Sequence, residues 1–309
     1  MKGMLVLEDG NKFEGELING DSFCGEVVFN TAMCGYQEIL TDPTNYGQLM
    51  VMTYPMQGNY GVNNVFNQSS ASMVNAVIVG ELCDKPSNWQ SEGTLLRYLE
   101  KNKITCLYNV DTRAVTRHIR KNGAMRGVLV SDCTSIAKVS EMLAAEVNNI
   151  NAQSVTTPVV YRLPQEGFKV AVIDFGIKKS IMDALTGSGF DLTIFPADSD
   201  SAEIMADNPD GIFLSNGPGN PKLLEKSIDA VKELLNLKPL FGVGMGHQVL
   251  ALALGGDTYK LKFGHHGVNQ PVKDLLGNKV HITAQNHGYA VDENSLSKMD
   301  VTVTHRSLN

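Results

Sequence analysis

From Lys169 onward the chain alternates short apolar runs with helix-like segments, and this alternation constrains its fold more than any other feature. The apolar runs are KVAVIDFG (169–176), FDLTIFPA (190–197), DGIFLS (210–215) and KPLFGV (238–243). Strands that are buried on both faces and separated by helices form parallel units with right-handed crossovers. We therefore expect an α/β domain with a doubly wound, mostly parallel sheet, whose ligands bind beyond the carboxyl ends of the strands.

The first half of the chain follows a different pattern, in which short apolar segments are separated by Gly and Asn turns. Strands are predicted at 4–20, 25–33 and 75–82, the first two with antiparallel character, and helices at 93–103 and 111–123. This half is therefore expected to be a mixed α and β domain. A polar stretch with two prolines at 148–167 indicates a boundary. We expect an N-terminal domain at 1–150, a linker at 151–168 and a second domain at 169–309.

Charge and composition exclude several classes of protein. Lys and Arg total 26 against 33 for Asp and Glu, a net charge of −7, and no basic run stands out, so no nucleic-acid partner is expected. The N-terminus lacks the apolar core of a signal peptide and no apolar run reaches membrane-spanning length, which favours a cytoplasmic protein without a membrane partner. The five cysteines are scattered through the first half without C-x-x-C spacing, so neither a disulfide framework nor a zinc site is indicated.

The glycine-rich turn in PLFGVGMGHQVLALALGG (239–256) has the pattern of a nucleophile elbow without a nucleophile. In such elbows the reactive side chain lies on a strained turn between strand and helix, with small residues two places to either side. Gly242 and Gly246 hold the flanking places and Gly244 holds the centre. A thiol at the centre would be favoured as the thiolate by the helix start, and the Met245 amide would face an oxyanion. Glycine can supply neither function, so a plain glycine-rich turn is the alternative.

A second stiff loop, SNGPGNP at 215–221, follows another predicted strand. Its two glycines and two prolines fix backbone amides in an exposed turn, and fixed amides can form an oxyanion hole. A tight connection between a strand and a helix explains the same residues equally well.

Together these motifs resemble those of one enzyme family. FGVGMGHQVLALALGG, SNGPGNP, KFGHHGVNQPV and TAQNHGYAVDE resemble the class I (triad) glutamine amidotransferases. In the first half, LVLEDGNKFEGE, GEVVFNTAMCGYQEILTDPTNYGQ and DTRAVTRHIRKNGAMRG are similar to the domain that distinguishes the small, glutaminase subunit of carbamoyl-phosphate synthetase. The resemblance runs from Leu5 to Asn309.

The resemblance implies a heterodimeric enzyme. The small subunit would hydrolyse L-glutamine to glutamate and ammonia, and the ammonia would pass through a tunnel to a large subunit. That partner would use ATP, magnesium and bicarbonate to make carbamoyl phosphate for arginine and pyrimidine biosynthesis. No cofactor and no metal are expected in the present chain.

The resemblance also implies roles for residues around the two loops. The amides of Gly217 and Met245 would contact an oxyanion, and these two residues with Gly219 would also contact the backbone of the substrate. Gln248, one helical turn into the helix after the elbow, would hold glutamine.

The remaining substrate contacts implied by the resemblance come from two separate motifs. In AQNHGYA, Asn286, Gly288 and Tyr289 would hold the amino-acid end of glutamine. In TDPT, Thr44 would reach in from the N-terminal domain, at a position where the family commonly has Ser.

This sequence departs from the family at the catalytic triad. The nucleophilic Cys of the family falls on Gly244, and its catalytic His and Glu lie in a motif that the resemblance places after Asn309. Without a nucleophile no thioester can form, so the chain is predicted to lack glutaminase activity. The alternatives are a non-catalytic scaffold that supports ammonia-dependent synthesis by a large subunit, and a glutaminase of another synthetase, against which the N-terminal domain argues.

Two further features have ordinary structural explanations. His265, His266, His281 and His287 suggest a metal site, but adjacent histidines on a strand point to opposite faces and no third ligand has suitable spacing. The basic helix at 111–123 could be a partner surface or a solvated face, and the sequence favours the solvated face.

Overall fold

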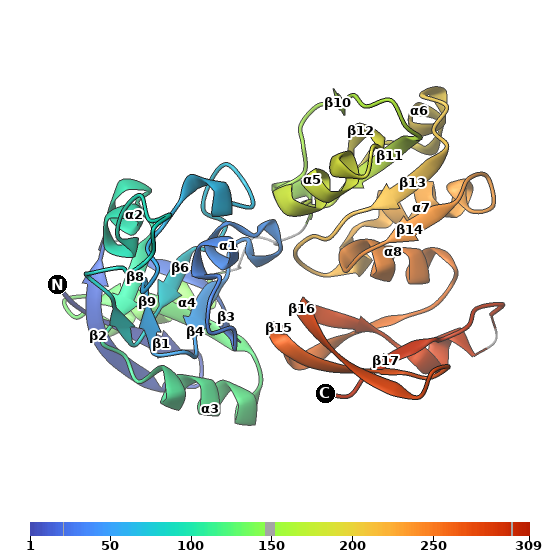
Figure 1. Ribbon diagram of the computed structural model, residues 1–309. Helices are drawn as coiled ribbons and strands as arrows, with labels where there is room; N and C mark the ends of the chain where they lie inside the picture. The colour runs from blue at the N-terminus through green and yellow to red at the C-terminus, as the bar shows by residue number, and fades with distance from the viewer. Residues whose placement is uncertain (21, 146–151, 298) are drawn as a thin grey trace. The chain divides into compact units, whose positions relative to one another are not determined.

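A computed structural model describes residues 1–309 except 21, 146–151 and 298, and Figure 1 shows the order of its elements. Contacts divide the chain into two compact units. The first comprises Met1–Asn148, Lys262–Gln270 and Ile282–Gln285, and the second comprises Asn149–Leu261, Pro271–His281 and Asn286–Asn309. The predicted boundary between residues 150 and 151 lies outside the described residues.

The first unit is built on a seven-stranded sheet that closes into a barrel. In spatial order its strands are β1 (Lys2–Leu7), β2 (Lys12–Ile18), β8 (Thr105–Tyr108), β6 (Ala76–Ile78), β4 (Leu49–Met52), β3 (Phe23–Asn30) and β9 (Met125–Ser131). The ring closes because β9 pairs antiparallel with both β1 and β3. The antiparallel character predicted for 4–20 is confirmed, because this stretch forms β1 and β2, which pair antiparallel with Leu5 opposite Phe13. The stretch predicted at 25–33 corresponds to β3, which pairs antiparallel with β9 but in parallel with β4. β4, β6 and β8 also pair in parallel.

Four helices and two short strands complete the main elements of the first unit. They are α1 (Tyr36–Thr41), α2 (Leu95–Lys101), α3 (Thr112–Asn122), α4 (Ile136–Ala144), β5 (Met56–Gln57) and β7 (Glu81–Leu82). The two helices predicted from the sequence are α2 and α3. α3 begins where the Asp111 carboxylate accepts a hydrogen bond from the Ala114 N–H, and it ends at Gly123 with φ 105°. Its buried residues Val115 and Ile119 join the core inside the barrel.

The second unit contains the expected α/β sheet. Its strands lie in the order β10 (Tyr161–Leu163), β12 (Asp191–Pro196), β11 (Lys169–Asp174), β13 (Gly211–Leu214) and β14 (Leu240–Gly242). The four strands predicted from the apolar runs are β11 to β14, and their pairings with one another are all parallel. The doubly wound, mostly parallel sheet is therefore confirmed.

The segment expected to be a linker adds a strand to this sheet. β10 lies at the edge and pairs antiparallel with β12, with Arg162 opposite Thr193. A strand of three residues carries little periodic signal, so the sequence pattern did not indicate it.

Helices follow the parallel strands as the alternation predicts. They are α5 (Lys179–Gly187), α6 (Ser201–Ala206), α7 (Glu225–Leu234) and α8 (Met245–Ala253), with a 3-10 turn, η4 (Pro221–Leu223), before α7. α8 packs against β13, β14 and α7, as Figure 1 shows within this unit. Met245, Val249 and Ala253 recur at helical spacing on α8 and are all buried in the core under the sheet.

Beyond α8 the chain forms a long hairpin and a short third strand. The elements are β15 (Thr258–Asp274), β16 (Lys279–Val291) and β17 (His305–Ser307). The middle of the hairpin belongs to the first unit, where Phe263 stacks on Phe29 with ring centroids 5.6 Å apart. Among the described residues, no helix has the length and apolar character needed to cross a membrane.

Candidate active site

The turn between β14 and α8 has the backbone geometry of a nucleophile elbow. Gly244 lies at its apex with φ 55° and ψ −110°, and α8 begins at the next residue. Residues that carry a side chain rarely adopt a positive φ, so the backbone would be strained here with any residue other than glycine. The elbow is held by the Gly246 N–H, which donates to the carbonyls of Ser215 (2.8 Å) and Val243 (3.0 Å).

The three glycines of the elbow differ in the space around them. A Cβ on Gly246 would lie 2.2 Å from the Leu214 carbonyl oxygen, and one on Gly242 would lie 2.6 Å from the Gly246 carbonyl carbon. A Cβ on Gly244 would instead meet only Asn216, at 3.6 Å, which is ordinary van der Waals contact. The flanking positions therefore require glycine for close packing, whereas the apex has room for a side chain.

The loop at 215–221 lies beside this apex, where a Cβ on Gly244 would meet Asn216. The expectation of an exposed turn was wrong, because residues 215–218 and Pro221 are buried and Gly219 and Asn220 are half-buried. The Ser215 hydroxyl accepts a hydrogen bond from the Phe175 N–H and donates to the Asn216 carbonyl, both at 2.8 Å. The Asn216 side chain donates to the Gly176 carbonyl at 2.8 Å and accepts from the Lys178 N–H at 3.3 Å. These bonds fix the start of the loop to the end of β11.

Close packing also explains the first glycine of the loop. A Cβ on Gly217 would lie 2.1 Å from the Phe175 carbonyl oxygen, and Gly219 has φ 89°. Within the described part of the chain, neither the Gly217 nor the Met245 N–H donates a hydrogen bond to another residue. Backbone N–H groups in such positions can donate to a ligand or a developing negative charge.

Asp174, at the carboxyl end of β11, holds the turn that follows this strand and was missed by the sequence reasoning. Its carboxylate accepts hydrogen bonds from the N–H groups of Thr157, Gly176 and Ile177, each at 2.8 Å. Burial raises the pKa of Asp174 above its usual range, against the opposing effect of these backbone hydrogen bonds. An acidic residue that ends the apolar run KVAVIDFG was the available sequence signal.

A hydrogen bond joins two of the residues that were expected to bind glutamine. The buried Gln248 side chain of α8 donates from Nε2 to the Tyr289 carbonyl of β16 at 2.8 Å. The same carbonyl is contacted by His287 Nδ1 at 2.7 Å. Gly288 lies between His287 and Tyr289 on β16, and a Cβ on Gly288 would meet no atom within 4 Å.

The other predicted site residues lie in different surroundings. Asn286 is half-buried on β16 in the second unit, with Gly288 and Tyr289. Thr44 belongs to the first unit, in a 3-10 turn at Pro43–Asn45, where its N–H donates to the Asp42 carboxylate at 2.9 Å. The roles of Thr44 and Asn286 toward glutamine stay predictions.

The four histidines of the hairpin are divided between the two units. His265 Nδ1 contacts Gln285 Oε1 at 3.0 Å, and His265 and His266 belong to the first unit, whereas His281 and His287 belong to the second. Among the described residues, no group of three His, Cys, Asp or Glu side chains could hold a metal ion. His247 is exposed on α8.

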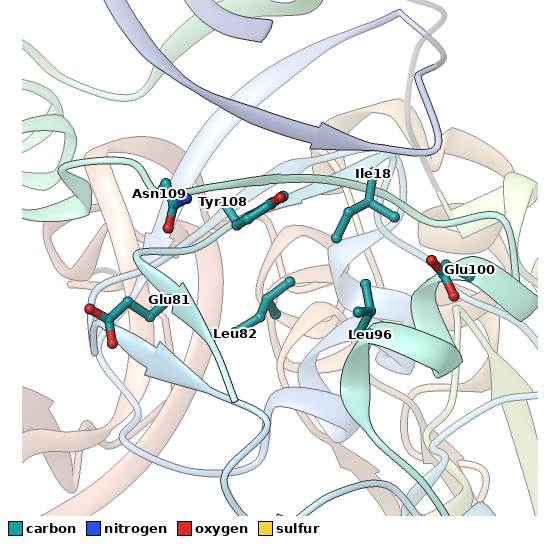
Figure 2. Close-up of a pocket in the computed structure, with 7 residues that line it drawn as sticks. All are labelled: Ile18, Glu81, Leu82, Leu96, Glu100, Tyr108 and Asn109. Carbon is teal, nitrogen blue, oxygen red and sulfur yellow. The ribbon is translucent and has the colours of Figure 1, made fainter. Parts of the chain in front are cut away.

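A cavity of about 490 Å³ in the first unit contains none of the predicted site residues. In Figure 2 its apolar side chains lie between two glutamates that come from β7 and α2. The lining residues are Ile18, Glu81, Leu82, Leu96, Glu100, Tyr108 and Asn109.

Comparison with known proteins identifies the family. A family model described as "Carbamoyl-phosphate synthase small chain, CPSase domain" matches residues 5–129, and one described as "Glutamine amidotransferase class-I" matches residues 171–309. The carbamoyl phosphate synthase small chain of Caldanaerobacter subterraneus subsp. tengcongensis is 49% identical over 310 residues, which cover 100% of this chain and 85% of the relative. The carbamoyl phosphate synthase small chain of Clostridium perfringens is 46% identical over 310 residues, which cover 100% of this chain and 88% of that relative. The chain therefore belongs to the carbamoyl-phosphate synthase small chain family, with a class I glutamine amidotransferase domain in its second half.

Proposed function

We propose that this chain is the glutamine-binding subunit of a carbamoyl-phosphate synthase and that it does not itself hydrolyse glutamine. In this proposal a large subunit makes carbamoyl phosphate for arginine and pyrimidine biosynthesis, in the cytoplasm, with ATP, magnesium and bicarbonate. The chain supports that partner structurally, and synthesis in the complex draws on free ammonia. Membership of the small chain family supports the partner and the substrate class.

The observation that carries the proposal is the backbone of Gly244. Its φ of 55° and ψ of −110° place an elbow apex between a strand and a helix, beside Asn216. Covalent hydrolysis of an amide requires a nucleophile at this apex, which attacks the amide carbon, releases ammonia and leaves an acyl-enzyme for water to cleave. Glycine has no side chain to form that bond.

Glutamine binding does not require the nucleophile, so the remaining site supports a retained binding function. The Gly217 and Met245 N–H groups belong to buried residues and make no hydrogen bond within the described residues, so they can donate to a ligand oxygen. The hydrogen bond between Gln248 and Tyr289 holds α8 and β16 together where the resemblance places the amino-acid end of glutamine.

The test compares nitrogen donors in the assembled enzyme. The chain is combined with the large subunit of the same organism, and carbamoyl phosphate is measured with glutamine and then with ammonium chloride. We expect synthesis with ammonia and none above background with glutamine. Glutamine-dependent synthesis at a rate comparable to that with ammonia would refute the proposed inactivity.

A repaired variant separates a missing nucleophile from a lost binding site. Gly244→Cys is compared with the unsubstituted chain in a protein whose residues 1–309 are followed by the His- and Glu-containing segment of a relative. We expect the Gly244→Cys protein to release ammonia from glutamine, because it carries the thiol and its base. If it folds, binds glutamine by calorimetry and stays inactive, the loss of activity does not come from position 244.

A further inference from the structure

The first unit carries a groove that none of the roles described above uses. It has a volume of about 610 Å³ and lies between α3 and the segments that follow β3 and β4. Its lining residues are Thr31, Met33, Thr53, Tyr54, Pro55, Val110, Asp111, Thr112, Arg113, Thr116, Arg117 and Arg120. We call it the α3 groove.

One wall of the α3 groove is cationic. Arg113, Arg117 and Arg120 follow each other on α3 at spacings of four and three residues, which brings them to one side of the helix. Each is exposed, and none of them takes part in an ion pair among the described residues. The carboxylate nearest in sequence, Asp111, accepts the hydrogen bond that caps α3. Like charges at this spacing repel one another, and an acidic partner would relieve that repulsion.

A second part of the lining is apolar and reaches the surface, and we call Met33, Tyr54 and Pro55 the apolar wall. Met33 is 68% exposed, Tyr54 is 36% exposed and Pro55 is exposed too. Met, Tyr and Arg are the residue types that protein interfaces enrich, and Tyr and Arg dominate binding energy there. A phosphate or a nucleic-acid backbone would use the arginines but would leave this apolar wall in water.

We propose that the α3 groove binds an acidic segment of the large subunit, with carboxylates against the arginines and an apolar side chain between Met33 and Tyr54. The sequence had favoured a solvated face for this helix. The joint presence of an exposed apolar wall and unpaired arginines in one groove supports a docking surface instead. This inference rests on the proposed function, which supplies the partner.

The test measures binding of the chain to the large subunit with charge-reversed variants. Arg113→Glu, Arg117→Glu and Arg120→Glu are each compared with wild type by biolayer interferometry. We expect each to raise Kd at least about tenfold, because each places a carboxylate against an acidic partner. Added salt should slow association of the wild-type chain, since exposed charges are screened.

The matched control is Arg97→Glu on α2, an exposed arginine of the same unit outside the groove. It changes the net charge equally and should leave Kd within about twofold of wild type. Met33→Ala probes the apolar wall without a change in charge and should also raise Kd. Circular dichroism and the unfolding midpoint establish that each variant is folded.

The outcomes separate the inference from the proposed function. If the wild-type chain does not bind the large subunit, the proposed function fails and the inference fails with it. If the wild-type chain binds and the three groove variants bind as tightly as Arg97→Glu, the large subunit docks elsewhere and only the inference is refuted.

Discussion

Gln248 and Tyr289, 41 residues apart in the chain, are joined by a hydrogen bond of 2.8 Å from the Gln248 Nε2 to the Tyr289 carbonyl. The bond connects the helix of the elbow to the second strand of the long hairpin. Two segments expected to contact the same substrate are thereby held in a defined relation within the second unit.

Replacing Gln248 with Met removes this bond while keeping an unbranched side chain of similar size. We expect the free energy of unfolding to fall by about 1 kcal/mol, because His287 still contacts the Tyr289 carbonyl. We also expect calorimetry to show weaker glutamine binding. His247→Ala, at an exposed neighbouring position, is the control. Unchanged stability and unchanged glutamine affinity in Gln248→Met would contradict the assigned role.

The space around the elbow glycines predicts a strong contrast between two alanine variants. Gly246→Ala places a Cβ 2.2 Å from the Leu214 carbonyl oxygen and should cost about 3 kcal/mol of stability or prevent folding. Gly244→Ala meets no close atom and should cost only about 1–2 kcal/mol, from backbone strain. Urea unfolding of both proteins measures the difference. Equal losses of stability in the two variants would contradict the difference in space around Gly244 and Gly246.

A thiol at the apex should be accommodated and reactive. Gly244→Cys is expected to fold and to react with a glutamine analogue that carries an electrophilic carbon, because the thiol lies at the start of α8. Peptide mapping by mass spectrometry locates the adduct and distinguishes it from labelling of the exposed Cys34 and Cys133. Labelling confined to Cys34 and Cys133 would contradict this prediction, and so would labelling at position 244 that added glutamine does not reduce.

Asp174 is expected to be important for stability although it is distant from the elbow in sequence. Asp174→Asn replaces an acceptor of three backbone N–H groups with an amide that cannot satisfy all of them, and should cost about 2–3 kcal/mol. Asp183→Asn, which removes an exposed ion pair with Lys179, should change stability by less than about 0.5 kcal/mol. Chemical denaturation of both variants tests this, and similar values for the two would contradict it.

Alkaline pH should destabilise the first unit through Tyr60. Burial raises the pKa of its hydroxyl from 10.0 to about 12, while this hydroxyl accepts a hydrogen bond from the Gly35 N–H. The folded state thus holds the proton more tightly than the unfolded state. The free energy of unfolding is therefore unaffected by this group below its unfolded pKa and falls as pH rises from 10.0 to about 12.

The variant Tyr60→Phe removes the titrating hydroxyl and should reduce this alkaline loss of stability. Burial also raises the pKa of Tyr36, which stacks on Tyr60, so a smaller pH dependence will remain. Urea midpoints measured across this pH range in both proteins give the comparison. Identical slopes would exclude Tyr60 as a cause.

Much of the second unit could be predicted because its signals are local. The four apolar runs gave the parallel strands β11 to β14, and the glycine spacing around Gly244 gave the elbow. β10 could not be predicted, since three residues are too few for a periodic pattern and its place depends on pairing with β12. The role of Asp174 depends on the backbone N–H groups of Thr157, Gly176 and Ile177, which only the folded chain brings to its carboxylate.

The sequence by itself determined the family, the alternation of strands and helices, and the absence of a nucleophilic side chain at position 244. These properties are carried by residue types and their spacing along the chain. The tertiary structure decided which glycines are required for packing and that the apex can hold a side chain. It also decided that arginines of α3 share a groove with Met33 and Tyr54. Contacts of this kind join atoms far apart in sequence, so they are fixed by how the elements pack rather than by any local pattern.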